Sequence, residues 1–499
     1  MKKIIYFCGL IFLSIVIVLN LTFTANLDLS EHITIKFNSF VYIIGIIILG
    51  ISLYIINKTI NEKLYEDIEK RKKVRKILFI ITISIYIIFN IIWCILVRPP
   101  IVGDQIHACN LAQTFYNGNL EEFLPNMTYA NIPLSDYMQA YHQQISLSFV
   151  FSIFFRIIHY DGIGILRVLN IIGNIFIVVA LYKIGTQLSK KYKVNKVFLL
   201  FLITTFISLT MLSTFIYGDI PSIALCLFSV YFIMKYTETG KIRYPITASI
   251  LTMIAYMMRM NSLIFIIATV IYLLINLFNE FTKRNTKQNL IKILIIAMYI
   301  IISIIPSSLV KTYYLNKYNL DKQKEYPNIS YFLMAMEESW RGNGWYNEDI
   351  GEPALKDPIN KKIEYKDRIK ERLTYFSKHL DYTFDFYTKK IASMWTENTY
   401  SAVRSNITEE NDQIVKITEP LIIFQKASLI LMCVCSLIVL IQNRKNLSTD
   451  VILLITIFIG GFAFHILWEA KSRYIIPYII TLIPVASICI NKINMKRKF

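Results

Sequence analysis

Long apolar runs separated by short polar clusters dominate the chain. A membrane-spanning helix needs about 20 consecutive, mostly apolar residues, and about twelve segments approach this length. We predict spans at 4–23, 40–57, 77–97, 163–183, 197–216, 218–236, 244–258, 261–278, 291–311, 418–441, 450–468 and 473–490. The pattern therefore predicts an all-α polytopic membrane protein with about twelve transmembrane helices.

Composition excludes most other classes of protein. Of the 499 residues, 55% are hydrophobic and 17% are charged, and the mean hydropathy is +0.49. Ordinary globular chains have roughly 45–50% apolar and about 25% charged residues, so a soluble enzyme, a disordered chain and a disulfide scaffold are excluded. The net charge of +19 comes from Lys and Arg clusters between apolar runs. This placement is typical of membrane topology, and we expect no nucleic-acid partner.

The basic clusters predict the orientation of the spans. Cytoplasmic loops of membrane proteins carry an excess of Lys and Arg. We therefore place five clusters in the cytoplasm, at 70–76, 190–193, 283–284, 444–445 and 496–498. All five fit one alternating topology with both termini inside.

The segment 141–158 is apolar enough to form a further span. If it crossed, every later loop would change side, and the cluster at 190–193 would face outward. We therefore predict a juxtamembrane or re-entrant helix on the outer face. Its polar start, His142-Gln143-Gln144, suits an interfacial position.

Two long outer loops follow from this topology, 98–162 and 312–417, and the second contains a predicted soluble helix near 355–380. Long loops are usually functional. The short cytoplasmic loops have no room for a nucleotide-binding domain, and an ATP-driven pump is not expected. We divide the chain into an accessory N-terminal hairpin with its basic loop (1–76), a transmembrane core (77–311), an outer soluble region (312–417) and C-terminal transmembrane helices (418–499).

Asp104 is the first candidate catalytic residue. It follows Pro99-Pro100 and Gly103, which end the third span in a turn, and it precedes a predicted amphipathic helix over 107–117. An Asp at such a position often serves only as a helix N-cap. A carboxylate at the start of a helix on the membrane surface also suits a general base. This residue alone does not separate the two interpretations.

Asp219 lies in a second outer turn, the hairpin 217–222. Pro221 suits the first turn of the following helix, which favours an N-cap role for a single residue. Two carboxylates in separate outer loops can nevertheless converge on one site. There one would act as base and the other would hold a metal ion or a polar substrate.

Three cations lie in predicted outer turns, where positive charge is disfavoured. Arg259 follows the seventh span, and Lys471 and Arg473 precede the last one. Guanidinium groups bind phosphate bidentately, which suggests a phosphate site; the alternative is simple snorkelling to the interface. The aromatic, Gly- and Asn-containing segment 337–347 either covers a sugar site or is an ordinary turn-rich loop.

These motifs, taken in order, resemble the GT-C fold of integral membrane glycosyltransferases. Gly103-Asp104-Gln105 resembles the acidic motif of their first outer loop, and the hairpin 217–222 resembles the acidic position of their second. The run 469–478 resembles an SRY-x-x-P element of bacterial relatives of the protein O-mannosyltransferases and of the lipid A aminoarabinose transferase. The chain departs from this pattern by having Gln105 in place of a second acid and by two extra N-terminal spans.

The resemblance implies an inverting hexosyl- or pentosyltransferase. Its donor would be a polyprenyl-phosphate sugar from the bilayer, and its acceptor an envelope glycan, lipid or protein. The protein would lie in a bacterial plasma membrane with its active site facing outside, and the loop 312–417 would close over the site to exclude water.

The resemblance also implies roles for individual residues. Asp104 would deprotonate the acceptor hydroxyl, and Asp219 would orient the donor sugar or support the acceptor. Arg473, with Arg259 or Lys471, would neutralise the developing phosphate charge. The predicted substrate-binding set also includes Gln105, His107 and Tyr474. We predict no metal-ligand cluster, and Gln105 leaves the participation of a divalent cation open.

Three other functions remain as alternatives. A polysaccharide polymerase or ligase also has a large outer loop and basic residues, but uses a lipid-diphosphate glycan. A secondary transporter of envelope precursors would carry ionisable residues near the bilayer midplane and internal repeats. The predicted spans contain almost no Asp or Glu, and no repeat is evident. A non-catalytic envelope protein would tolerate loss of Asp104.

Overall fold

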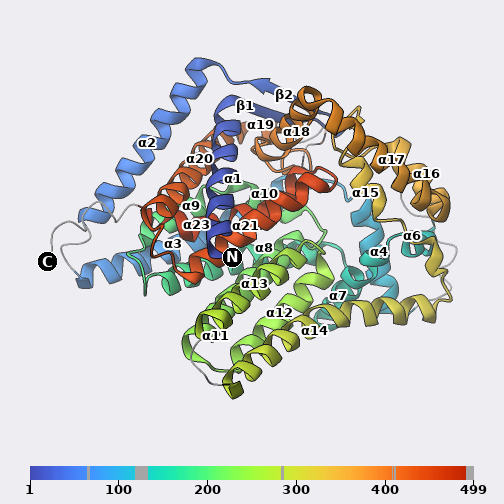
Figure 1. Ribbon diagram of the computed structural model, residues 1–499, viewed down its shortest axis with the longest axis horizontal. Helices are drawn as coiled ribbons and strands as arrows, with labels where there is room; N and C mark the ends of the chain where they lie inside the picture. The colour runs from blue at the N-terminus through green and yellow to red at the C-terminus, as the bar shows by residue number, and fades with distance from the viewer. Residues whose placement is uncertain (64–67, 119–132, 282–285, 407, 409–411, 490–499) are drawn as a thin grey trace.

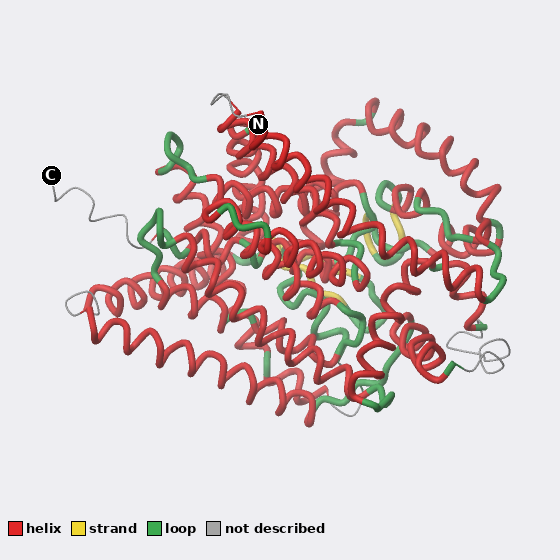
Figure 2. The backbone as a smooth tube through the Cα atoms, turned by 90° about the horizontal axis from the view of Figure 1, so that it is seen from below, coloured by secondary structure: helices red, strands yellow, loops and turns green. Residues whose placement is uncertain are grey.

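The computed structural model describes the chain except for residues 64–67, 119–132, 282–285, 407, 409–411 and 490–499. Figure 2 shows a tube that is almost entirely helical, with only short strand segments. The all-α prediction is confirmed. A helix satisfies its own backbone hydrogen bonds, which is why apolar spans adopt this structure in lipid.

Nine helices in the described chain are long and apolar enough to cross a membrane. They are α1 (Lys2–Thr22), α2 (Phe40–Lys63), α3 (Ile68–Leu96), α8 (Gly164–Leu188), α11 (Asp219–Thr239), α13 (Ser262–Phe281), α14 (Thr286–Lys317), α20 (Glu419–Gln442) and α21 (Thr449–Leu467). Each coincides with one of the predicted spans. The exact number of crossings stays a prediction, because three other predicted spans have different forms.

Those three segments are shorter or broken. The segment 244–258 forms α12 (Arg243–Met258), a helix of 16 residues. The segment 473–490 is not one helix: its described part forms η4 (Ser472–Ile475), α22 (Ile476–Ile479) and α23 (Leu482–Ala486). Pro477 and Pro484 lie within this segment, and proline removes a backbone donor and blocks a regular helix.

The segment 197–216 is bent rather than straight. It forms α9 (Lys196–Thr204), α10 (Ile207–Met211) and η2 (Leu212–Thr214), with a bend of 47° at the break. Side chains of neighbouring helices bond the freed backbone groups. The Gln425 amide oxygen accepts from Ser208 N at 3.0 Å, and Asn174 Nδ2 donates to Leu209 O at 2.9 Å. Irregular backbone at membrane depth requires such partners.

The two long loops that we predict to be outer contain short helices and strands. The first loop contains α4 (Asp104–Asn117), α6 (Leu134–Ala140) and α7 (His142–Ile158). The second contains η3 (Lys322–Lys324), α15 (Ile329–Met334), β3 (Glu338–Ser339), β4 (Gly342–Asn343), α16 (Glu348–Lys356), α17 (Pro358–Lys378), α18 (Leu380–Trp395) and α19 (Asp412–Ile417). In Figure 1, α15 to α17 lie beside α4 and α6 at the right.

Two predictions about these loops have different outcomes. The helix expected near 355–380 is confirmed as α17, which starts with an N-cap at Asp357 and Pro358 in its first turn; that it lies outside the membrane stays a prediction. The segment 141–158 forms α7, a helix of 17 residues packed against α4, α12 and α14. That it does not cross the membrane stays a prediction.

The N-terminal region contacts both the C-terminal helices and the outer loop. α1 packs against α20 and α21, and the antiparallel pair β1 (Phe23–Leu27) and β2 (Ile33–Phe37) continues outward from it. Ala25 N donates to Thr396 O at 3.3 Å, and Ile33 N donates to Arg341 O at 2.8 Å. The turn between the first two spans is therefore fixed to the outer region 312–417.

Basic clusters predicted to share the cytoplasm lie together. Residues 190–193 and 444–445 line one cavity. The clusters at 283–284 and 496–498 lie outside the described residues, as do the side chains of 70–71.

This arrangement generates a topological prediction. In a background without the seven native cysteines, a cysteine at position 191 should resist a membrane-impermeant thiol reagent applied to intact cells. A cysteine at position 378, at the end of α17, should react. Labelling at 191 but not at 378 would reverse the predicted orientation; labelling after permeabilisation controls for accessibility.

Candidate active site

Asp104 is held by two tyrosines. Its Oδ1 accepts a hydrogen bond from the Tyr137 hydroxyl and its Oδ2 accepts one from the Tyr217 hydroxyl, both at 3.0 Å. The N-cap of α4 is Gly103, whose φ of 59° lies in the region that favours glycine, and Asp104 is the first helical residue. The Asp104 carboxylate therefore faces phenols from two other segments, which is not the arrangement of an N-cap.

Gln105 and His107 contact the segments that carry the two tyrosines bound to Asp104. The Gln105 amide oxygen accepts from Ile216 N at 2.7 Å, which ties α4 to the segment before Tyr217. The His107 ring stacks on Tyr137, with centroids 3.9 Å apart and planes 14° apart. Burial lowers the pKa of His107, although Asp104 acts in the opposite direction. The two side chains thus position the phenols that bind Asp104.

Asp219 faces two guanidinium groups. Its Oδ1 lies 3.3 Å from Arg259 Nε and 3.8 Å from Arg473 Nε. All three side chains are almost buried. Asp219 Oδ2 is buried with no hydrogen-bond partner among the described residues. A cavity of about 10 Å³ beside Asp219 and Arg259 has room for roughly one water molecule.

Tyr217 connects these two halves of the site. Its hydroxyl bonds Asp104 and receives the Gln144 amide. The Arg259 guanidinium carbon lies 4.5 Å from the centroid of its ring, and the Arg473 carbon lies 5.8 Å away, within the range of cation–π attraction. Burial, and next the Asp104 charge, raise the pKa of Tyr217 well above its ordinary value, so the phenol stays neutral. The Tyr217 ring therefore lies between Asp104 and the two arginines.

Tyr474 and Lys471 border the cation pair. Both guanidinium carbons lie 5.7 Å from the Tyr474 ring. Lys471 Nζ lies 3.6 Å from Glu31 Oε1. The structure thus brings together all the residues that the sequence analysis selected.

Glu31 is a charged residue of this site that the sequence analysis missed. It lies in the turn between β1 and β2, and its carboxylate pairs with Arg341, with Arg404 at 3.3 Å and with Lys471. Burial alone would raise the pKa of Glu31, but these three cations and Arg473 together lower it to about 2. Only its place between two spans on the predicted outer face could have drawn attention to it.

Glu469 is the second missed acid. It is 5% exposed and follows α21 in an extended segment, two residues before Lys471. In the part of the chain that the structure describes, its carboxyl group has no hydrogen bond or ion pair. Burial raises the pKa of Glu469; Lys471 opposes this shift, while Glu31 and Asp104 reinforce it. Burial thus makes ionisation of the Glu469 carboxyl group less favourable than it is in water.

Aromatic rings form a continuous wall from Asp104 toward Glu469. Successive centroids lie 3.9, 4.9, 5.6, 5.2 and 5.0 Å apart. The rings in this order are His107, Tyr137, Tyr141, Tyr326, Tyr331 and Trp468. Within the segment 337–347, Trp345 is buried and donates to Ser393 Oγ at 2.8 Å, whereas Arg341 reaches Glu31. Tyrosine faces and hydroxyls suit a sugar ligand, which has both C–H faces and hydroxyls.

We next considered whether the acidic residues of the site could bind a metal ion. Among the described residues, no three His, Cys, Asp or Glu side chains gather in a metal-binding arrangement. Asp104 faces two phenols and Asp219 faces two guanidinium groups. Both carboxylates thus have donor groups of the protein as their neighbours.

Comparisons with known proteins agree with the sequence motifs. Residues 143–306 match the family described as dolichyl-phosphate-mannose-protein mannosyltransferase. This range contains Asp219 and Arg259, but neither Asp104 nor Arg473. The resemblance to protein mannosyltransferases is confirmed over these residues.

A solved structure is similar in outline. It is the archaeal oligosaccharyltransferase AglB from Archaeoglobus fulgidus, in complex with an inhibitory peptide and a dolichol-phosphate. The match has 12% identity and a TM-score of 0.44, and it covers 84% of this chain and 50% of AglB. This chain thus spans about half the length of that protein. No match was found among curated proteins.

Glu31 generates a stability prediction. Glu31→Gln should leave Arg341, Arg404 and Lys471 crowded without their anion, and should cost on the order of 3 kcal/mol at pH 7. A lowered folded-state pKa stabilises above the ordinary value of 4.5, and this contribution is lost as the pH falls toward about 2. Thermal unfolding in detergent should show a constant loss from pH 7 to about 4.5. The matched control is Asp385→Asn, an exposed outer acid; an equal effect of both variants would contradict the role of Glu31.

Glu469 generates a second stability prediction, in which the pH dependence is opposite to that of Glu31. A raised folded-state pKa stabilises the protein below the ordinary value of 4.5, and this contribution is lost as the pH rises through the folded value. Glu469→Gln removes the charge that burial disfavours. The stability of the variant relative to the wild type should therefore rise as the pH increases above 4.5, whereas that of Glu364→Gln, an exposed control, should not. A pH-independent difference would show that Glu469 is charged and paired throughout.

Proposed function

We propose that the chain is a membrane glycosyltransferase that takes a sugar from a polyprenyl-phosphate donor. The family match over 143–306 supports the class of enzyme. One geometric observation supports the reaction: Tyr217 binds Asp104 through its hydroxyl and places Arg259 and Arg473 against its ring. Asp104, as a base for the acceptor, and the two arginines, as cations for a phosphate leaving group, thus lie on either side of Tyr217.

The proposed reaction is a single displacement at the anomeric carbon. The acceptor hydroxyl loses its proton to Asp104 and its oxygen bonds the sugar C1. The bond from C1 to the phosphate oxygen breaks, and polyprenyl phosphate leaves with the electron pair. Attack from the face opposite the phosphate inverts the configuration. The Tyr137 and Tyr217 hydroxyls hold the carboxylate in one orientation before the acceptor arrives.

The cations serve the leaving group. Arg473 and Arg259 would neutralise the charge that develops on phosphate, and this stabilisation is strong where water is excluded. Asp219 is the positioning residue for both, because it faces the Nε atom of each. Lys471 and Tyr474 complete the phosphate side, and Glu31 fixes Lys471.

The aromatic wall is proposed as the sugar side. It starts beside Asp104 and ends beside Glu469, whose carboxyl group would form a hydrogen bond with a sugar hydroxyl. Its rings come from both outer regions, so the region 312–417 would cover the site and exclude water. Acceptors of this class are envelope glycans, lipids or proteins on the outer face of a bacterial plasma membrane.

Lipid analysis tests the class of enzyme. In cells lacking the gene, mass spectrometry should show accumulation of a polyprenyl-monophosphate sugar and loss of one sugar from an envelope acceptor. Accumulation of a lipid-diphosphate glycan would instead identify a polymerase or ligase. Unchanged lipids and glycans would leave a transporter or a non-catalytic protein.

Asp104 generates the kinetic prediction. Asp104→Asn keeps the size of the side chain and a carbonyl acceptor for one phenol, but removes the base. Transfer measured at matched expression should fall by roughly two to four orders of magnitude, the typical contribution of a general base. Asp136→Asn is the control, since Asp136 also lies in the first turn of a short outer helix but is exposed. Near-normal transfer by Asp104→Asn would contradict the mechanism.

A further inference from the structure

A second charged cavity lies at the opposite end of the bundle from Asp104. Its volume is about 800 Å³, within the range of roughly 300–1,000 Å³ typical of small-molecule sites. It is lined by residues 189–193, residues 441–446 and Ile488, and we call it the inner basic cavity. The first segment follows α8, the second ends α20 and follows it, and the third follows α23.

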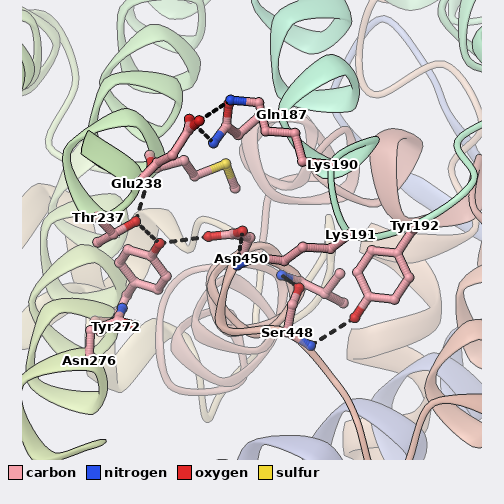
Figure 3. A network of polar contacts seen from close by, with 12 residues as sticks. Gln187, Lys190, Lys191, Tyr192, Thr237, Glu238, Tyr272, Asn276, Ser448 and Asp450 are labelled. Atoms are coloured by element: carbon pink, nitrogen blue, oxygen red, sulfur yellow. Dashed lines mark hydrogen bonds and ion pairs between the residues drawn. The ribbon is translucent and has the colours of Figure 1, made fainter. Parts of the chain in front are cut away.

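The lining carries one sign of charge. Five of the lining residues are cationic and none is acidic: Lys190, Lys191, Lys193, Arg444 and Lys445. Figure 3 shows that two of these lysines are tied to acids behind the wall. Lys190 pairs with Glu238, and Lys191 Nζ lies 2.9 Å from Asp450 Oδ2. Arg444 and Lys445 are exposed and form no ion pair with the described residues.

Hydrogen bonds between the lining segments fix the walls of the cavity. The Tyr192 hydroxyl accepts from Ser448 N at 2.8 Å, which joins the loop after α8 to the loop after α20 (Figure 3). Asn195 N donates to Ser487 O at 2.8 Å, which joins the first loop to the third segment. Asp450 also accepts from the Tyr272 hydroxyl at 2.7 Å, so the acid behind Lys191 is itself fixed. These bonds set the spacing of the cations.

The position of the cavity indicates the ligand. It lies where the candidate membrane helices α8 and α20 end, on the predicted cytoplasmic side. Ile441, in the lining and near the end of α20, is 57% exposed, and Arg444 and Lys445 follow it by three and four residues. An apolar side chain beside two available cations suits a molecule with an acyl chain and a phosphate. The single aromatic ring of the lining, Tyr192, already uses its hydroxyl within the wall.

We propose that the inner basic cavity binds the phosphate head group of an anionic phospholipid from the cytoplasmic leaflet. The phosphate lies between Arg444, Lys445 and the paired lysines, and the acyl chains follow the apolar end of α20. Lys190 and Lys191 remain paired with Glu238 and Asp450, and they add to the positive potential in the cavity. The site is separate from the proposed transfer reaction, which takes place at the other end of the molecule.

Native mass spectrometry of the delipidated full-length protein tests the site. Phosphatidylglycerol should bind more tightly than phosphatidylcholine of the same chain length. The double variant Arg444→Gln/Lys445→Gln should weaken phosphatidylglycerol binding by roughly 20- to 30-fold, since each basic residue contributes about fivefold. Lys241→Gln/Arg243→Gln is the matched control, because both residues are exposed cations at the same end of the bundle. This control should bind like the wild type.

Several outcomes would overturn the proposal. Equal weakening in the control would show only general surface attraction, and equal binding of phosphatidylcholine would exclude head-group recognition. Competition by soluble glycerol 1-phosphate at the concentration of the lipid would show that a free phosphate ligand fits as well. If the double variant does not fold, the single variant Lys445→Gln should still weaken binding by about fivefold. Its unfolding temperature in detergent controls for its stability.

Discussion

Every backbone group freed inside the apolar bundle needs a partner, and this constraint shapes the candidate site. The break after α9 leaves peptide groups without helical partners. Asparagine and glutamine side chains of neighbouring helices take their place: Asn170 donates to Ser213 O and Phe215 O, at 3.0 and 2.9 Å. Gln105 then bonds Ile216 N. These side-chain amides thus fix the irregular segment that follows the break.

The fixed segment ends at Tyr217, and the charges of the site are arranged around that residue. An isolated charge out of water costs several kcal/mol, whereas a paired one costs far less. Asp219 is paired with Arg259 and Arg473, and Glu31 is paired with three cations of the outer region. Glu469 lacks such a pair among the described residues, and burial raises its pKa. The site thus places paired acids and an unpaired acid within one buried region.

Much of this architecture follows from local pattern, and the rest does not. Run length predicted the nine long helices, and the residues near 355–380 predicted α17, because these signals act within one segment. The break within 197–216 has no proline or glycine to announce it; it depends on Gln425 and Asn174 from distant helices. Glu31 belongs to no motif, and Glu469 begins the run 469–478 but was not selected as a site residue. Their surroundings arise only when distant segments meet.

The docking of the N-terminal turn has a consequence for biosynthesis. Glu31 is made early, yet its partners Arg341, Arg404 and Lys471 emerge from the ribosome hundreds of residues later. At about 5–20 residues per second, Lys471 follows Glu31 by roughly 20–90 s. During that interval the turn between α1 and α2 lacks its ionic partners. The contacts between the two ends of the chain therefore form last, after the turn that carries Lys471 has been made.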